Sequence, residues 1–557
     1  MSAARSTPLP VASAERKHED PAEPERIPAH AFEQWKPRYN PWIVALTVTL
    51  ATFMELLDTA VANVALPHIA GNLSASQDES TWVLTSYLVS NAVVLPASAW
   101  LSVLIGRKRF YMTCVALFTL SSLLCGLAPS LGLLVLFRVI QGLGGGGLAT
   151  SEQAILADTF SINQRGRAFA LYGMAVVLAP AIGPTLGGWI TDNYNWRWIF
   201  FINVPVGLIS LYLTNRIVED PPYMKVERKK TLDNPIDYRG LGLIGAGMGC
   251  LQYVLDKGRT EDWFSSKTIT VLAITSLVAL IWFVVNEWKQ QFPIMELKLL
   301  KQRNFAISAL MMFVLGMVLF GTTVLIPQFL QTLMGYSAEQ AGKALTAGGV
   351  ALIFMMPIVG QLISRVDPRK MIAVGFVSTS LALFHMTTIN TDIDFGTAAT
   401  YRVYQMIGLS LLFIPITTLA YVGMPSNKSN QIAGMNNFMR NLGGSIWISL
   451  QSTYFQHLSY KHHASLSAHA TVGNPLFRNK LAILTQIFTR QGIQLNEATA
   501  RAYALIGRMI SVQASVLAYV DIISLMALVL MCLVVVPIFM QGSQRKAAPG
   551  VPAIKLR

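Results

Sequence analysis

Phe137-Arg138-Val139-Ile140-Gln141 recurs later in the chain as Tyr401-Arg402-Val403-Tyr404-Gln405, and both copies lie inside hydrophobic stretches. The segments before the two copies also correspond, since Gly106-Arg107-Lys108 matches Asp367-Pro368-Arg369-Lys370 at nearly the same offset. Two matching halves are typical of carriers that work by alternating access, in which the substrate binds between the halves. The repeat therefore predicts two related helical bundles that rock against each other.

The composition predicts that these bundles lie in a membrane. Of the 557 residues, 53% are hydrophobic and only 13% are charged, whereas about a quarter of a soluble protein is charged. A helix needs roughly 20 mainly apolar residues to cross a bilayer. Such stretches recur from Trp42 almost to the C-terminus, with no soluble domain between them. We therefore expect an all-α polytopic membrane protein with the lipid bilayer as its surroundings.

The hydrophobic stretches predict about fourteen spans, arranged as two six-helix halves with two extra central spans. The first half is expected over 41–215, a cytoplasmic loop and the extra spans over 216–304, and the second half over 305–539. A polar stretch at 456–511 is expected to form a long outer loop with helical segments such as 479–488 and 496–506. The expected spans lie near 41–66, 81–105, 110–128, 131–157, 168–190, 199–215, 239–256, 268–286, 305–334, 342–363, 370–388, 398–423, 431–455 and 512–539.

The distribution of charge predicts the orientation in the membrane. The formal net charge is +14, and with these spans most Lys and Arg residues fall in alternate connections, which the positive-inside rule assigns to the cytoplasm. Both termini are then cytoplasmic, as polar tails over 1–40 and 540–557. The N-terminal tail has no apolar core, so the first span is expected to serve as the insertion signal. Basic charge placed in this way does not indicate nucleic-acid binding.

Ionisable side chains inside the spans are the first candidates for function, because burying a charge in a membrane is costly. Glu55 and Asp58 lie one helical turn apart in the first span, and Arg138 and Glu152 lie in the fourth. A carboxylate in a poorly solvated cavity can take up a proton from one side and release it to the other. The alternative is that these acids pair with Arg138, Arg402 or Arg440 and only hold the bundle together.

A second candidate is the run Gly-Met-Ala-Val-Val-Leu-Ala-Pro-Ala-Ile-Gly-Pro-Thr-Leu-Gly-Gly at 173–188. Its two prolines remove backbone donors and are expected to bend the helix, while glycines at GxxxG spacing let a neighbouring helix approach closely. Ordinary small-residue packing accounts for the glycines but not for the prolines. The residues concerned are Gly173, Pro180, Gly183, Pro184, Gly187 and Gly188.

Polar side chains in the thirteenth span are expected to face a cavity, where they line the substrate path or lock the halves together. They are Asn436, Asn437 and Arg440, and Asn63 and Gln141 are further candidates for the path. Other patterns are discounted. Gly240 to Gly245 fits GxGxxG but follows no strand, and His457, His462, His463 and His469 are interpreted as loop surface. No metal or organic cofactor is expected.

These motifs resemble those of a known family. Residues 173–188 resemble the antiporter motif of the drug:proton antiporters in the major facilitator superfamily, and 196–205 (Trp-Arg-Trp-Ile-Phe-Phe-Ile-Asn-Val-Pro) resemble the stretch that follows it. Residues 57–67 are similar to the first-span motif of the fourteen-span branch, and 138–142 match its fourth-span motif. The resemblance covers about Trp42 to Pro537. It is strongest to the EmrB-like multidrug export permeases, which also carry a long loop before the last span.

The resemblance implies an inner-membrane exporter of small hydrophobic or amphipathic toxic compounds, powered by the proton motive force. Asp58 and Arg138 would take part in proton coupling, and residues 179–188 would keep the halves in leak-free contact. The loop at 456–511 would dock a periplasmic adaptor that leads to an outer-membrane channel, although an inert lid is the alternative. The expected cytoplasmic gate residues are Gly106, Arg107, Lys108 and Arg365.

The sequence departs from the family in the loop before residue 106. The family pattern Gly-x-Leu-Ala-Asp-Arg-x-Gly-Arg is changed here, because Ala99, Val103 and Leu104 replace its first Gly and its Asp-Arg pair. The usual salt-bridge latch therefore does not carry over, and Arg365 in the second half is expected to do more of this work. The remaining alternatives are a dedicated exporter of one metabolite or siderophore, a receptor, and a membrane enzyme, which would need a cluster such as HExxH that the chain lacks.

Overall fold

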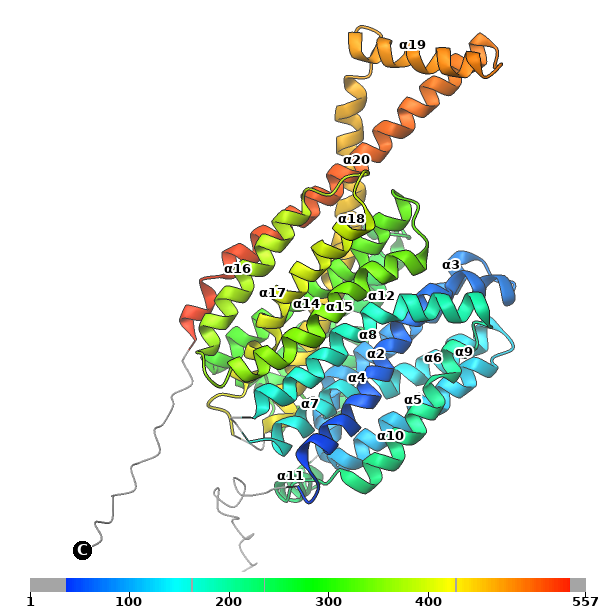
Figure 1. Cartoon of the computed structure of the whole chain (residues 1–557). Coiled ribbons are helices and arrows are strands. Elements are labelled where there is room, and N and C mark those ends of the chain that lie inside the picture. Colours follow the sequence, from blue (N-terminus) through cyan, green and yellow to red (C-terminus); the bar gives the residue numbers. More distant parts are fainter. Residues whose placement is uncertain (1–36, 162–163, 235, 426–427, 541–557) are drawn as a thin grey trace, which may run out of the picture. The chain divides into compact units, whose positions relative to one another are not determined.

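The structure, a computed structural model, describes residues 37–161, 164–234, 236–425 and 428–540. The polar tails expected at 1–40 and 540–557 lie outside these ranges except for residues 37–40 and 540. All regular secondary structure in the described ranges is helical (Figure 1). The prediction of an all-α membrane protein is therefore confirmed.

The first half of the chain forms a bundle of long helices. They are α2 (Pro41–Asn72), α4 (Trp82–Ile105), α5 (Arg107–Leu127), α6 (Leu131–Gly145) with its continuation α7 (Leu148–Thr159), α8 (Arg165–Asn193) and α10 (Asn203–Ile217). Two short helices, α3 (Gln77–Ser80) and α9 (Trp198–Phe201), lie in the connections. The break between α6 and α7 falls in the run of four glycines at 144–147, where helix propensity is low.

The second half repeats this arrangement after an inserted pair of helices. The inserted pair is α12 (Tyr238–Lys257) and α13 (Lys267–Lys289), preceded by α11 (Tyr223–Leu232) and joined to its neighbours by the short turns η1 (Trp263–Ser265) and η2 (Leu297–Lys301). The second bundle contains α14 (Arg303–Thr332), α15 (Ala338–Leu362), α16 (Pro368–Met386), α17 (Phe395–Ala420), α18 (Ser429–Ala468), α19 (Pro475–Arg490), α20 (Leu495–Leu533) and η4 (Val536–Phe539).

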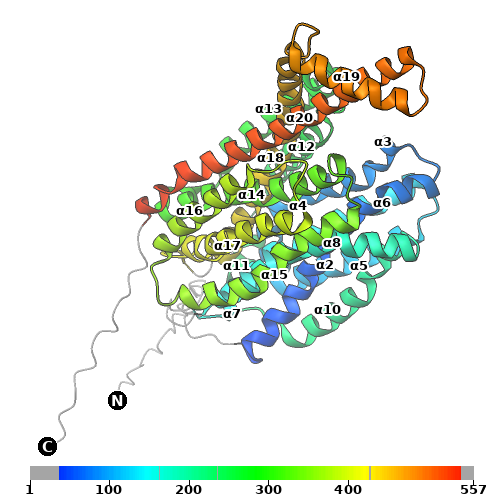
Figure 2. The same cartoon turned by 45° about the horizontal axis from the view of Figure 1, so that its top comes forward.

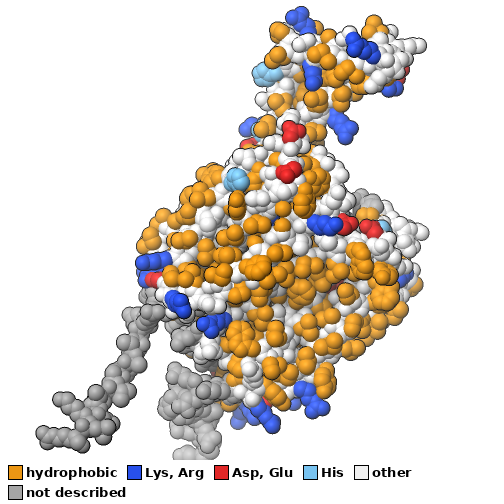
Figure 3. All heavy atoms as spheres, viewed as in Figure 1, with side chains coloured by type: hydrophobic (Ala, Val, Ile, Leu, Met, Phe, Trp, Pro, Cys, Tyr) orange, Lys and Arg blue, Asp and Glu red, His pale blue; other side chains and the backbone are white. Residues whose placement is uncertain are grey.

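Eleven of the described helical segments are long and apolar enough to cross a membrane. The other three expected spans correspond to α12, α16 and α18, which are long enough to cross a membrane but are not apolar enough to meet the same standard. The count of fourteen spans therefore stays a prediction. Figure 3 shows a broad band of hydrophobic side chains over the helical body, with Lys and Arg below it and on the segment above it.

The long outer loop expected at 456–511 is almost entirely helical, and we call these residues the arm. Helix α18 continues without a break past residue 455, and α20 already begins at Leu495, so both extend beyond the body of the bundle (Figures 1 and 2). Helix α19 joins them, and the helical segments expected at 479–488 and 496–506 lie within α19 and α20. The physical reason is that α18 contains no Gly or Pro between residues 445 and 468 that would end it.

Helix α8 is packed closely on both sides by small residues. Toward α2, a Cβ added to Gly183 would lie 2.3 Å from the Cβ of Ala60, and one added to Gly187 would lie 3.1 Å from Val61. Toward α15, a Cβ on Gly342 would lie 2.7 Å from Oγ1 of Thr185. The two prolines do not interrupt α8, which remains one helix from Arg165 to Asn193. Helix α8 therefore forms a continuous contact between the two halves.

Hydrogen bonding supports the same contact. Oγ1 of Thr346 on α15 donates to the carbonyl of Ala181 on α8 at 3.0 Å. Further along α8 and α15, a Cβ added to Gly360 of α15 would lie 3.2 Å from Ala170 of α8. A Cβ added to Gly173 of α8 would lie 2.9 Å from Phe413 of α17. Of the glycines singled out in the motif, Gly188 alone has no neighbouring atom within 4 Å of an added Cβ. It is therefore not required for packing.

Gly183→Ala is expected to lower the thermal unfolding midpoint of the purified protein, because the added methyl group forces α2 and α8 apart. Overpacking of this kind costs about 1–3 kcal/mol. Gly188→Ala is the matched control in the same helix and is expected to leave the midpoint unchanged. Equal midpoints for the two variants would contradict the close α2–α8 contact. The measurement is intrinsic tryptophan fluorescence during heating in detergent.

Candidate functional site

A buried ion pair lies in the first half, between α2 and α6. Nη1 of Arg138 donates to Oδ2 of Asp58 at 2.6 Å, and the two side chains are 0% and 1% exposed. Gln141 and Asn203 donate to Oδ1 of Asp58 at 3.2 Å and 2.6 Å. These four side chains form the Asp58 group. Its members come from α2, α6 and α10, so a charge change at Asp58 is felt by three helices.

Helix α4 connects the Asp58 group to a second acid. Nε of Arg138 donates to the carbonyl of Val83 at 3.0 Å, and its guanidinium carbon lies 4.4 Å from the ring centroid of Tyr87. The hydroxyl of Tyr87 donates to Oε1 of Glu55 at 2.7 Å. Tyr87 therefore contacts the cation on its ring face and the carboxylate of Glu55 with its hydroxyl. A displacement of Arg138 would change the surroundings of Glu55 through this one side chain.

A third set of polar side chains crosses from the first half to the second. The hydroxyl of Tyr172 on α8 donates to Oδ1 of Asn437 on α18 at 2.6 Å and accepts from Nη1 of Arg440 at 2.9 Å. Asn437 also donates to Oε1 of Gln153 on α7 at 2.7 Å. Arg440 interacts electrostatically with both Glu55 and Glu152. We call Glu55, Glu152, Gln153, Tyr172, Asn437 and Arg440 the interface cluster.

The interface cluster contains buried polar atoms without a partner. They include Oε2 of Glu152 and Nε2 of Gln153, and the neighbouring Asn436, outside the cluster, has both amide atoms unpartnered. The other oxygen of Glu152 accepts from Oγ1 of Thr49 at 2.6 Å. Burying such atoms unsatisfied is unfavourable. The place where the halves meet therefore holds buried donors and acceptors that no other group of the described residues satisfies.

The structure separates the residues predicted for the substrate path. Gln141 belongs to the Asp58 group, while Asn436, Asn437 and Arg440 are buried at the interface between the halves. Asn63 is exposed and lies with none of them. Hydrophobicity alone could not have separated these positions, because the face that a side chain takes depends on the tilt and rotation of each helix.

A buried ion pair that the sequence does not predict joins the start of α5 to the end of α7. Nη1 of Arg107 donates to Oδ2 of Asp158 at 2.5 Å, and Nη2 donates to the hydroxyl of Tyr223 on α11 at 2.7 Å. Ser429 on α18 donates to the other oxygen of Asp158 at 2.8 Å, so the group reaches the second half. Gly106 has a φ of +98°, which lets α5 begin directly after α4.

The other basic residues predicted for the gate, Lys108 and Arg365, form no buried ion pair among the described residues. Nζ of Lys108 donates to the carbonyl of Asn215 at 2.7 Å and is exposed. Arg365 is exposed, and none of the ion pairs found in the described ranges involves it. The partner missing from the loop sequence is thus replaced in space by Asp158, which lies 51 residues away and which no local pattern identifies.

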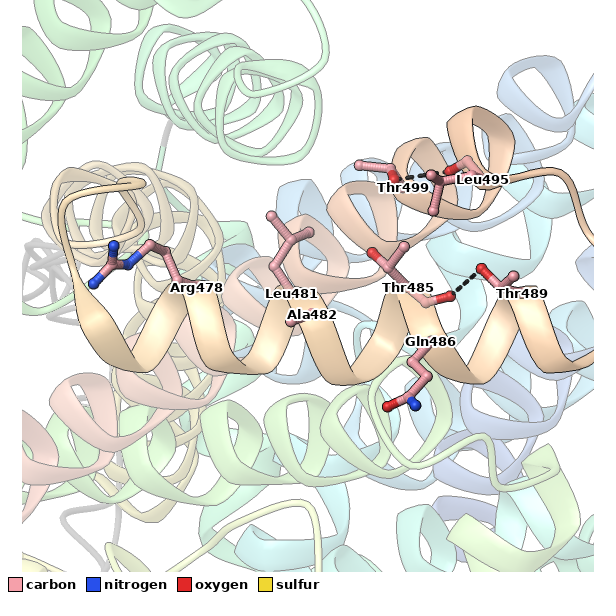
Figure 4. Close-up of a pocket in the computed structure, with 8 residues that line it drawn as sticks. All are labelled: Arg478, Leu481, Ala482, Thr485, Gln486, Thr489, Leu495 and Thr499. Carbon is pink, nitrogen blue, oxygen red and sulfur yellow. Dashed lines mark hydrogen bonds between the residues drawn. The ribbon is translucent and has the colours of Figure 1, made fainter.

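A surface groove of about 500 Å³ lies in the arm, between α19 and the start of α20. Figure 4 shows Leu481 and Thr485 pointing from α19 toward Leu495 and Thr499, whereas Gln486 points away. The arm is braced against the body by a contact of 2.8 Å between His462 on α18 and Asp521 on α20. The groove is far in sequence from the Asp58 group and shares no residue with it.

The site contains four side chains that the sequence analysis does not single out, namely Tyr87, Gln153, Tyr172 and Asn203. The signal for Asn203 was present, because it lies within the 196–205 stretch that resembles the family. Tyr172 directly precedes the glycine run, but a tyrosine in a hydrophobic stretch is usually a packing residue. Only the structure shows that its hydroxyl meets Asn437 and Arg440.

Arg107→Gln is expected to lower the thermal unfolding midpoint by several degrees, because it leaves Asp158 buried without its cation, at a cost of about 3–5 kcal/mol. Lys108→Gln removes an equally basic but exposed neighbour and is expected to leave the midpoint nearly unchanged. Heating the two purified variants in parallel tests this. Similar midpoints would mean that the Arg107–Asp158 pair does not stabilise the fold.

Comparison with known proteins agrees with this architecture. Residues 48–448 match the Major Facilitator Superfamily. The chain is 38% identical over 443 residues to the fatty acid resistance protein FarB of Neisseria gonorrhoeae, covering 80% of this chain and 86% of FarB. It is 36% identical over 475 residues to the multidrug export protein EmrB of Escherichia coli K12, covering 85% of this chain and 90% of EmrB.

A solved structure supports the fold. The human organic anion transporter MFSD10 aligns with a TM-score of 0.54 over 75% of this chain and 94% of that chain, at 12% identity. At this identity the likeness concerns the fold alone. Together with the matches along the sequence, it confirms the resemblance predicted from the motifs. The chain is a multi-pass membrane protein that belongs to the major facilitator superfamily, in the branch that contains EmrB and FarB.

Proposed function

We propose that the chain exports small hydrophobic or amphipathic compounds across the cytoplasmic membrane in exchange for protons. The observation that carries the proposal is the buried Asp58–Arg138 pair, which is joined through Tyr87 to an acid that faces the interface between the halves. The relatives named above support export, since one is a multidrug export protein and the other a fatty acid resistance protein.

The proton acts at Asp58 in this proposal. Protonation of the carboxylate leaves the Arg138 cation buried without its counter-charge, which is strongly unfavourable. The bundle can relieve this by moving α6 relative to α2 and α10, the helices that hold the Asp58 group together. Because the guanidinium lies over the ring of Tyr87, the same movement alters the hydrogen bond to Glu55. Proton binding is thereby linked to the interface cluster.

The transported compound binds at the interface cluster. Two carboxylates and one guanidinium face each other there across the two halves, and the unpartnered atoms of Glu152, Gln153 and Asn436 offer further contacts. Rocking of the halves about α8 and α15 would open this region alternately to each side. The tight small-residue contact along α8 limits leakage during the movement.

The arm is proposed to dock a periplasmic adaptor protein that connects to an outer-membrane channel. Helix α19 has no buried residue, and its exposed side chains include Leu476, Ile483 and Ile487. Its charged residues Arg478, Lys480 and Arg490 are all basic. An exposed apolar and basic helix is typical of a surface that another protein covers.

Asp58→Asn is expected to reduce substrate-dependent proton flux by roughly 100-fold, the lower range for loss of a proton-transfer group. The amide keeps the size of the side chain but cannot take up a proton. The measurement is the internal pH of vesicles that contain the purified protein, followed after addition of a lipophilic dye. Asp192→Asn changes an exposed acid on α8 and serves as the control. Undiminished flux in Asp58→Asn would remove Asp58 from the mechanism.

The proposed topology predicts opposite accessibility for two cysteine substitutions. In a variant lacking the four natural cysteines, His463→Cys in the arm should react with an impermeant maleimide added to intact spheroplasts. Lys225→Cys in α11 should react only after the membrane is permeabilised. The reverse pattern would invert the orientation, and reaction of both in intact spheroplasts would change the number of spans between them.

A further inference from the structure

The second half contains a copy of the Asp58 group in which the carboxylate is missing. Nη1 of Arg402 donates to Oγ1 of Thr322 and to Oε1 of Gln405, both at 2.8 Å. Gln405 also donates to Thr322 at 2.8 Å. Thr322 precedes Arg402 by 80 residues, the same separation as between Asp58 and Arg138. The threonine therefore occupies the position of Asp58 in the repeat.

The two groups share the pairing of Arg and Gln with a residue 80 positions before the Arg, but their charge is different. In the first half the guanidinium meets a carboxylate at 2.6 Å. In the second half it meets the hydroxyls of Thr322 and Thr323, the latter also at 2.8 Å. Arg402 is 1% exposed, its Nε has no hydrogen-bond partner, and it joins none of the ion pairs found among the described residues. A permanently charged side chain is thus buried without a counter-charge.

No nearby helix supplies the missing charge. The sequences of α14 and α17 contain no Asp or Glu, and the only acid of α15, Glu339, is exposed and paired with Lys343. The other buried arginine of the second half, Arg440, is different, because Glu55 and Glu152 of the first half lie within electrostatic reach of it. An uncompensated cation in a membrane interior is expensive and marks a functional position.

We propose that Arg402 is a recognition position for the carboxylate of an amphipathic anion that the protein exports. The free Nε of Arg402, together with a guanidinium N–H released from Thr322 or Thr323, would donate to the two oxygens of the carboxylate. Paired donors of a guanidinium suit a carboxylate in particular. This inference rests on the proposed export function and names one class of its substrates.

The neighbouring helix α15 covers Arg402 closely. Gly348 of α15 lies against its side chain, so that an added Cβ would be 2.6 Å from Cγ of Arg402. Helix α15 is also the helix that packs along α8 between the halves, with Thr346 bonded to Ala181. Movement of the halves therefore displaces the element that covers Arg402. The lack of a side chain at Gly348 lets α15 pack directly on the aliphatic part of Arg402, so a ligand would reach Arg402 only when α15 moves away.

The test supplies the missing charge from within the protein. Thr322→Asp recreates the ion pair of the first half, so the new carboxylate should pair with the Arg402 guanidinium and block a ligand carboxylate. Thr322→Asn introduces a side chain of the same size as Asp but without its charge. Export is measured in vesicles with two probes that share a tail and differ in the head group, decanoate and decyltrimethylammonium. We expect Thr322→Asp to reduce decanoate export about tenfold or more, as for loss of a charged hydrogen bond. Thr322→Asn should remain within about twofold of the natural protein.

Export of decyltrimethylammonium should be unchanged in both variants. Equal decanoate export by Thr322→Asp and Thr322→Asn would overturn the proposal, as would an equal loss of both probes in Thr322→Asp. If the natural protein exports the ammonium probe but not decanoate, the export function stands and this inference fails. Export of neither probe, with no proton flux, would count against both.

A second pair of variants covers the case in which Thr322→Asp does not fold, which size-exclusion chromatography would reveal. Arg402→Gln removes the cation and should lose decanoate export selectively, whereas Arg402→Lys keeps the charge and should retain part of it. Decanoate export by Arg402→Gln at the level of the natural protein would equally overturn the proposal.

Discussion

A buried cation must be compensated, and this requirement organises the first half of the molecule around Arg138. Its guanidinium meets Asp58 from α2, the Val83 carbonyl and the Tyr87 ring from α4, and Gln141 from its own helix. Asn203 at the start of α10 is recruited through Asp58. All of these contacts are arranged around the Arg138–Asp58 ion pair, so a change in the charge of Asp58 weakens the arrangement. In the proposed mechanism, the same interaction stabilises one arrangement and releases it when Asp58 takes up a proton.

The interface between the halves must be tight and yet able to move. Along α8 and α15 this is achieved with small side chains, since several glycines stand where any Cβ would meet the facing helix. Contacts of this kind hold helices close without long interlocking side chains. The polar contacts across the interface are few and include Thr346 with Ala181, Asn437 with Gln153, and Ser429 with Asp158. Each can break without dismantling either half.

The buried charges are distributed unequally between the halves. The first half buries Glu55, Asp58 and Glu152 together with Arg138, whereas the second buries Arg402 and Arg440 without an acid among the described residues of its core. The interiors are therefore complementary in sign, and Arg440 meets acids of the other half. The two halves place corresponding residues opposite Arg138 and Arg402, but the residue is Asp58 in the first half and Thr322 in the second. This single difference gives the two halves different chemistry.

The sequence alone determined the all-helical membrane fold and the repeat of two halves, and it singled out Asp58, Arg138 and the glycine run as candidates, because hydrophobic length, repeated motifs and charges within spans are local features of the sequence. It predicted helical segments in the arm, but not that α18 and α20 continue unbroken from the bundle into it. Tertiary structure decided the pairing of Arg107 with Asp158, the link from Arg138 through Tyr87 to Glu55, and the lack of an acid at Arg402. These depend on which faces of distant helices meet, and helix rotation is set by packing rather than by any local pattern.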